Sequence, residues 1–202
     1  MLLIITGPQG SGNHLFSKIF ALSDQVQGWA NLNKTYWIGH DQEPFAKYWH
    51  QPKLLDDFNW SYDYYVTSVS CPYVYYGETL VPDYDRFINR CSVPVKLAII
   101  GRDQTILEYQ QSRVRGRITK NKLLNVVDSL MKYNPVFISQ ELLYLYGANY
   151  IKSLGQQLEF PVSQDVTAIN EILKEDANKK YIEPVISHWL DEEVKLASRK
   201  PE

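Results

Sequence analysis

Two kinds of apolar pattern alternate along this chain, and they predict strands and helices in turn. Residues 2–6 form a continuous apolar run that Gly7 and Pro8 stop. Such a run is typical of a strand buried on both faces of a parallel sheet. Further strands are predicted at 64–70, 96–100 and 136–139. Each of these strands adjoins a segment with helical periodicity.

The helical segments are marked by apolar residues that recur on one helix face. After the first strand, this face is formed by Leu15, Phe16, Ile19 and Phe20, and Asn13 precedes them as the expected N-cap. Further helices are predicted at 106–114, 123–131, 142–158, 166–173 and 185–194. Alternating strands and helices require crossover connections, so the pattern predicts an α/β fold with three α/β/α layers around a mostly parallel central sheet.

The length of 202 residues favours one domain spanning 1–202, because a typical domain has about 150 residues. An aromatic-rich segment at about 29–62 interrupts the alternation. It contains four of the five tryptophans, Trp29, Trp37, Trp49 and Trp60. We expect this segment to be a lid or insertion, whose flat side chains either stack on a sugar or phenol or belong to the core.

Composition and charge exclude several classes of protein. Lys and Arg number 21 against 23 Asp and Glu, a net charge of −2, so no overall positive field favours nucleic acid or an acidic membrane as partner. The two cysteines are too few for a disulfide scaffold and are expected to be buried thiols. The short apolar N-terminal run has no preceding Lys or Arg, which predicts neither a signal peptide nor a membrane helix. We therefore expect a soluble, cytoplasmic protein.

The segment GPQGSGNH, residues 7–14, joins the first predicted strand to the first predicted helix. Its two outer glycines have the spacing of a phosphate-binding loop, in which backbone N–H groups and a helix N-terminus attract an oxyanion. Asn13 stands where lysine would reach the phosphates, and His14 where Ser or Thr would hold Mg²⁺. The segment therefore disfavours magnesium ATP. The alternative interpretation is a tight turn in which Gly10 and Gly12 serve only the backbone.

In its sequence Pro8, Gln9, Gly10, Ser11, Gly12, Asn13, this segment resembles the phosphate loop of the sulfotransferase family. Residues 97–113 look like the family's strand, Arg-Asp turn and helix. Residues 136–162 look like its later strand, long helix and closing proline, and VTSVSCPY is similar to the end of another family strand. The resemblance covers most of residues 1–162 and implies a sulfotransferase-like fold.

The resemblance also implies a donor, 3′-phosphoadenosine 5′-phosphosulfate, and the residues that bind it. Amides of residues 9–14, including that of His14, would hold the 5′-phosphate, and Arg102 would bind the 3′-phosphate through its planar fork. Gln110 occupies the position of a family serine that binds the same phosphate and can donate from its amide. Gln9 replaces a family cation, and Ser70 replaces a family histidine. Gln9, Ser70 and Gln110 therefore depart from the family pattern.

Sulfonate transfer to a hydroxyl needs a base for the acceptor proton, and histidine is suited to that task near neutral pH. His40 is the candidate base, and Glu43 is the alternative because some sulfotransferases that act on sugars use a glutamate at a comparable place. The acceptor is expected to be a small molecule or a saccharide. No metal-ligand motif is found, so no metal is predicted. The alternative functions are a nucleotide or small-molecule kinase and a catalytically inactive nucleotide-binding relative.

Overall fold

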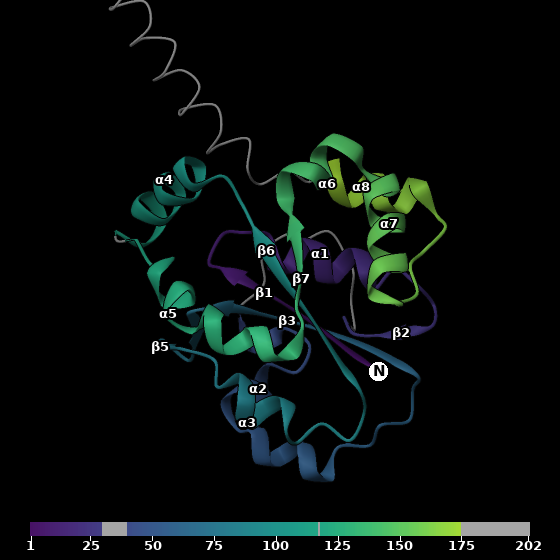
Figure 1. Ribbon diagram of the computed structural model, residues 1–202, viewed down its shortest axis with the longest axis horizontal. Helices are drawn as coiled ribbons and strands as arrows, with labels where there is room; N and C mark the ends of the chain where they lie inside the picture. Colours follow the sequence, from purple (N-terminus) through teal and green to yellow (C-terminus); the bar gives the residue numbers. More distant parts are fainter. Residues whose placement is uncertain (30–39, 117, 175–202) are drawn as a thin grey trace, which may run out of the picture.

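The computed structural model describes residues 1–29, 40–116 and 118–174 (Figure 1). Its centre is a five-stranded sheet in the order β2-β3-β1-β6-β7, and every neighbouring pair in this sheet is parallel. The strands are β1 (Leu2–Pro8), β2 (Val26–Gln27), β3 (Tyr64–Cys71), β6 (Val95–Gly101) and β7 (Val136–Ser139). A separate antiparallel hairpin consists of β4 (Tyr73–Tyr75) and β5 (Glu78–Leu80).

Helices lie on both faces of the sheet, and Figure 1 shows α6, α7 and α8 on the side opposite α2 and α3. The α-helices are α1 (Asn13–Phe20), α2 (Ala46–His50), α3 (Tyr84–Ile88), α4 (Gln104–Arg115), α5 (Asn121–Leu130), α6 (Gln140–Tyr146), α7 (Ala148–Leu158) and α8 (Val166–Lys174). Three short 3₁₀ helices are η1 (His40–Gln42), η2 (Pro52–Asp57) and η3 (Met131–Tyr133).

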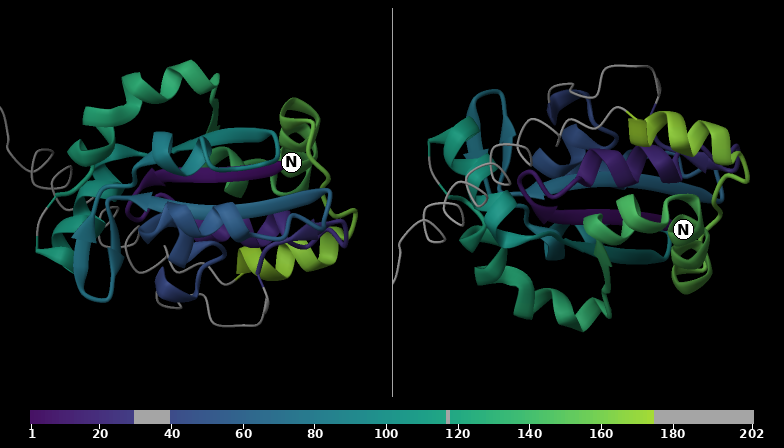
Figure 2. Two further views of the ribbon diagram at one scale, coloured as in Figure 1. Left: turned by 90° about the horizontal axis from the view of Figure 1, so that it is seen from below. Right: turned by 90° about the horizontal axis from the view of Figure 1, so that it is seen from above.

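The strand β1 is buried on both faces, which is why its sequence is apolar without alternation. Leu3 and Ile5 pack into a core with α1, α6, α7 and α8. Leu2 and Ile4 pack into a second core with α2, α3 and α5. The two panels of Figure 2 look onto the sheet from these two opposite sides. The predicted α/β fold with a parallel sheet and helices on both faces is thereby confirmed.

The four predicted strands are confirmed within one or two residues at each end, but two predictions about helices are wrong. The predicted helix over 142–158 is two helices, because Gly147 has φ 53° and ψ −129° and separates α6 from α7. Asn13 is not the N-cap of α1. Gly12 takes that position with φ 100°, and Asn13 is the first helical residue. The predicted helix at 185–194 lies outside the described residues.

Much of the aromatic-rich segment packs against the sheet. Trp49 is 3% exposed and stacks on Phe87 at 3.7 Å between ring centroids. Its Nε1 donates a hydrogen bond to Thr67 on β3. The ring centroids of Phe45 and Phe58 are 5.1 Å apart, and both side chains pack against the same core. Over 43–60 these aromatic side chains therefore contribute to the second core, while a lid over the site stays a prediction and residues 30–39 lie outside the described ranges.

None of the helices within the described ranges combines the length and apolar character needed to cross a membrane. Cys71 is buried and Cys91 is half-buried, and both are free thiols. The prediction of buried thiols is confirmed for Cys71, whereas Cys91 is a free thiol that is only partly buried.

Replacing Trp49 with alanine tests the placement of the aromatic segment in the core. Trp49→Ala should lower the free energy of unfolding by about 3–5 kcal/mol, because it removes a buried ring and leaves a cavity. Urea denaturation followed by circular dichroism measures the loss. Tyr76→Ala is the control, because Tyr76 is 82% exposed and its loss should change the stability by less than about 1 kcal/mol. Equal stabilities of the two variants would contradict the observed packing.

Candidate functional site

The segment that joins β1 to α1, called here the glycine loop (residues 7–14), lies at the centre of the carboxyl edge of the sheet. β1 pairs with β3 on one side and with β6 on the other. The chain after β1 first adds β2 and β3 on one side and later β6 and β7 on the other. Ligands of open α/β sheets bind at such a reversal of strand order, outside the carboxyl ends of the strands. The position of the loop therefore agrees with that of a ligand site.

Tight geometry explains why the loop is rich in glycine. Ser11 N donates to Pro8 O at 3.1 Å, which turns the chain back after β1. Gly10 and Gly12 have φ angles of 90° and 100°, values that glycine adopts without strain. At Gly7 an added β-carbon would lie 2.4 Å from Ser11 Oγ. Larger residues at these positions would clash or strain the turn.

Side chains from the β6–α4 region hold the glycine loop. Arg102 follows the last residue of β6, and its guanidinium donates to the carbonyl oxygen of Gly10 and to Gln110 Oε1. Gln111 Nε2 donates to the carbonyl oxygen of Gln9 at 2.8 Å. Three residues that the sequence predicted for the site, Gln9, Arg102 and Gln110, are thus brought together at the loop.

Two of the loop's polar side chains are directed into the protein. Asn13 is 4% exposed, and its Nδ2 donates to Ser70 Oγ at 2.9 Å. Gln9 is 2% exposed, and its Oε1 accepts from Thr119 Oγ1 at 3.0 Å. Both side chains therefore form hydrogen bonds inside the fold, Asn13 with Ser70 and Gln9 with Thr119.

His14 and Glu43 are in contact beside the loop, with 2.5 Å between Nε2 and Oε1. The second oxygen of Glu43 accepts from Ser68 Oγ on β3 at 2.9 Å. Ser17 Oγ bonds Ser68 at 3.2 Å and accepts from Trp29 Nε1 at 2.9 Å. The His14 side chain is 12% exposed and that of Glu43 3%, so histidine is the outer member of the pair.

The predicted base His40 begins η1, three residues before Glu43. Its backbone is described, but its side chain lies outside what the structure describes, so its role stays a prediction. Glu43, the predicted alternative, lies close to the loop through its contact with His14. Sequence analysis missed Ser68 and Ser17. Ser68 could have been found from its place two residues before Ser70 on the same strand, since alternate residues of a strand share a face.

Sequence analysis also missed Gln140, the first residue of α6. Gln140 is 2% exposed, and a β-carbon built on Gly12 would lie 3.2 Å from its Nε2. Neither Nε2 nor Oε1 has a hydrogen-bond partner within the described part of the chain. This amide therefore lies, buried, directly against the N-terminus of α1.

Neutral polar groups lie beneath the loop. Thr6 Oγ1 and Tyr84 OH are 2.7 Å apart, and Cys71 pairs in register with Pro8. Burial raises the pKa of Cys71 to about 11 and raises that of Tyr84 well above its usual value. Both groups are consequently protonated at neutral pH, and Cys71 is not poised as a thiolate nucleophile.

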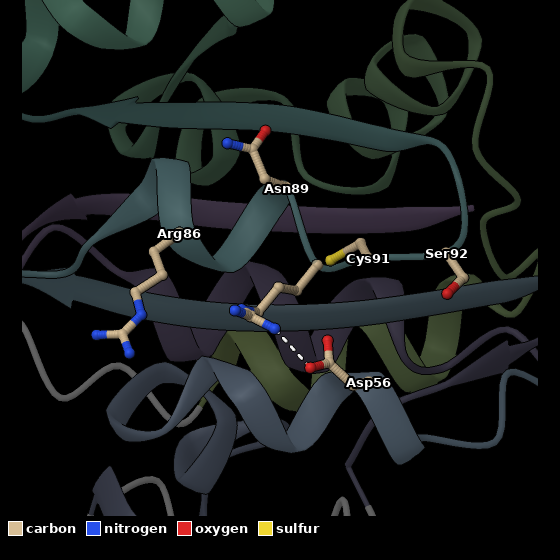
Figure 3. Close-up of a pocket in the computed structure, with 6 residues that line it drawn as sticks. Asp56, Arg86, Asn89, Cys91 and Ser92 are labelled. Carbon is tan, nitrogen blue, oxygen red and sulfur yellow. Dashed lines mark hydrogen bonds and ion pairs between the residues drawn. The ribbon is translucent and has the colours of Figure 1, made fainter.

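A hollow of about 520 Å³ opens at the other end of the sheet (Figure 3). It is lined by Asp56, Arg86, Asn89, Arg90, Cys91 and Ser92. These last residues precede β6, whose Val95 pairs with the first residue of β1, so the hollow is at the amino edge. Arg90 pairs with Asp56 across it. Among residues 1–29, 40–116 and 118–174, no group of three or more His, Cys, Asp or Glu could hold a metal ion.

Comparison of the chain with protein-family models and with curated proteins gave no match. The candidate site therefore stands on its geometry.

Replacing Gly10 with alanine tests the packing of the loop. A β-carbon there would lie 2.8 Å from Gln110 Oε1, so Gly10→Ala must displace the Gln110 amide from Arg102 as well as strain the backbone. Gly77→Ala is the matched control, because Gly77 has φ 86° and nothing within 4 Å of an added β-carbon. We expect Gly77→Ala to cost about 1–2 kcal/mol and Gly10→Ala about 1 kcal/mol more, measured by urea denaturation. Equal costs would contradict the contact between Gly10 and Gln110.

Proposed function

We propose that this chain is a sulfotransferase that moves a sulfonate group from 3′-phosphoadenosine 5′-phosphosulfate to an acceptor hydroxyl, with a phosphate loop of the sulfotransferase type. One observation carries the proposal. The glycine loop lies at the reversal of strand order with Arg102 bonded to it from the neighbouring strand end, and it contains no lysine.

Two phosphate-binding elements next to each other suit a donor with two phosphates on one ribose. The N-terminus of α1 begins at Asn13 and attracts an anion through its amides and its dipole. The Arg102 guanidinium reaches Gly10, three residues before that helix. Arginine is suited to a phosphate because its fork binds two oxygens at once. The 5′-phosphate would bind at the helix and the 3′-phosphate at Arg102.

The residues at the magnesium positions support a donor that needs no metal. Phosphoryl transfer by a phosphate loop uses a lysine on the β- and γ-phosphates and a Ser or Thr on Mg²⁺. Here Asn13 is bonded to Ser70 and His14 is paired with Glu43. These contacts favour sulfonate transfer over a magnesium-dependent kinase reaction.

The pair of His14 and Glu43 supplies acid–base chemistry for the transfer. The acceptor oxygen forms a bond to sulfur, and the bond between sulfur and the donor's phosphate oxygen breaks, so the electron pair leaves with adenosine 3′,5′-bisphosphate. His14, the more exposed member, acts in its neutral form: Nε2–H donates to Glu43 and Nδ1 takes the acceptor proton. Glu43, held by Ser68, stabilises the imidazolium, and the loop amides stabilise charge on the leaving oxygen. His40 remains the second candidate for the base.

An inactive nucleotide-binding relative is the second candidate function. It is favoured by Gln9, which stands where the sulfotransferase pattern has a cation and is 2% exposed with its amide bonded to Thr119. Such a protein would bind the bisphosphate at the same loop and transfer nothing.

The first prediction concerns donor binding. Adenosine 3′,5′-bisphosphate should bind the wild-type protein in the presence of EDTA, as measured by isothermal titration calorimetry. Arg102→Ala should weaken binding by roughly 1.5–3 kcal/mol, about 10- to 150-fold in Kd, because a charged hydrogen-bond donor to phosphate is lost. Arg90→Ala is the control, since Arg90 pairs with Asp56 at the opposite edge, and its Kd should equal that of the wild type. An unchanged Kd for Arg102→Ala removes Arg102 from the site.

The second prediction concerns turnover. Release of the bisphosphate from the sulfonate donor is followed with a panel of saccharide and phenolic acceptors. His14→Ala should reduce the rate about 10²-fold or more while leaving the Kd of the bisphosphate close to the wild-type value. Wild-type activity in His14→Ala would assign the base to another residue, and His40→Ala then tests that alternative. Bisphosphate binding without transfer to any acceptor would favour the inactive relative.

A further inference from the structure

The side-chain amide of Gln140 is buried without hydrogen bonds of its own. Gln140 is 2% exposed, and both Nε2 and Oε1 lack a partner within the described residues. Buried polar groups in native proteins are almost always hydrogen-bonded, since an unsatisfied one opposes folding. An amide kept in this state needs an explanation, and a ligand that completes its bonds is one.

The position of Gln140 indicates which ligand group that is. Gln140 follows Ser139, the last residue of β7, and begins α6. Its Nε2 would be 3.2 Å from a β-carbon on Gly12, and its Cδ 3.3 Å. Gly12 is the N-cap of α1 and provides no side-chain cap. The amide therefore lies beside the end of α1 at which an anion is favoured.

The chemistry of an amide suits this place. The helix N-terminus already carries partial positive charge, and a neutral donor adds a directed hydrogen bond without a further buried charge that would need its own counterion. The neighbouring acidic residue, Glu141, has hydrogen-bond partners of its own, because its carboxylate accepts from Asp103 N and from Ser139 Oγ.

We propose that Gln140 is a side-chain ligand of the oxyanion held by the glycine loop, with Nε2 donating to an anion oxygen at the N-terminus of α1. In this role it supplies, from α6, the side-chain donor that the loop does not supply at Asn13. The inference rests on the proposed function only for the identity of the nucleotide, because any phosphate group at the loop would receive the same hydrogen bond.

This role has a signature that a structural role lacks. Gln140→Met keeps the length of the side chain and removes both polar atoms. If the amide serves a ligand, its replacement by an apolar side chain leaves the melting temperature of the ligand-free protein unchanged or higher. If the amide serves the fold, the same variant melts at a lower temperature.

The experiment measures anion binding and melting temperature together. Inorganic pyrophosphate and adenosine 3′,5′-bisphosphate are titrated in EDTA into wild type, Gln140→Met and Gln140→Glu. Gln164→Met is the control, since Gln164 is exposed and bonds only weakly to the backbone, at 3.4 Å to Val162 O. We expect about 10-fold weaker pyrophosphate binding for Gln140→Met, still weaker binding for Gln140→Glu because of like charge, and no change for Gln164→Met.

The outcomes separate this inference from the proposed function. Wild-type affinity for pyrophosphate in Gln140→Met, or a fall of about 3 °C or more in its melting temperature, overturns the role of Gln140 and leaves the donor intact. Binding of pyrophosphate that depends on Gln140, without binding of the bisphosphate, supports the inference and overturns the proposed donor. Failure of the wild type to bind either compound overturns both.

Discussion

β1 is buried on every side, and the other elements of the fold are arranged around it. Its backbone pairs with β3 and β6, and its side chains fill two cores. Because β1 has neighbours on both sides, the chain turns out of the sheet only after the last residue of the strand. It then begins α1 at Asn13 on one face of the sheet. This turn explains why Gly10 and Gly12 have positive φ angles. It also places the N-terminus of α1 at the reversal of strand order.

The side chains around the loop divide its stabilisation between two regions. From the β6–α4 side, Arg102 and Gln111 donate to the carbonyl oxygens of Gly10 and Gln9, which holds those peptide groups in one orientation. From the β3 side, Ser70 accepts from Asn13 and Ser68 donates to Glu43. Most of these buried polar groups have partners, as desolvation requires. The loop is thus held in place by the fold itself, which would lower the conformational cost of binding the proposed donor.

Within the described residues around the loop, the Gln140 amide lacks such partners, and the proposed role in binding would account for this loss of stability. An amide that lacks partners in the folded chain costs stability, and the same lack makes it available to a ligand. His14 differs, because its partner Glu43 is part of the fold. His14 lies in the first turn of α1, whereas Gln140 reaches the N-terminus of α1 from the start of α6. A site of this kind can be preorganised for an anion without a lysine.

Local patterns were sufficient to predict the α/β fold, the position of the glycine loop and the strands at 2–6, 64–70, 96–100 and 136–139. These features follow from apolar runs, helical spacing and glycines, which act between neighbours along the chain. Short helices such as α2 and α3 escaped prediction, since five residues carry too little periodicity. Three contacts at the site could not be predicted in this way: His14 with Glu43, Arg102 with Gly10, and Gln140 with Gly12. Those contacts join residues far apart in the sequence, and they form because parallel pairing brings the carboxyl ends of β1, β3, β6 and β7 to one edge, a placement that no local pattern records.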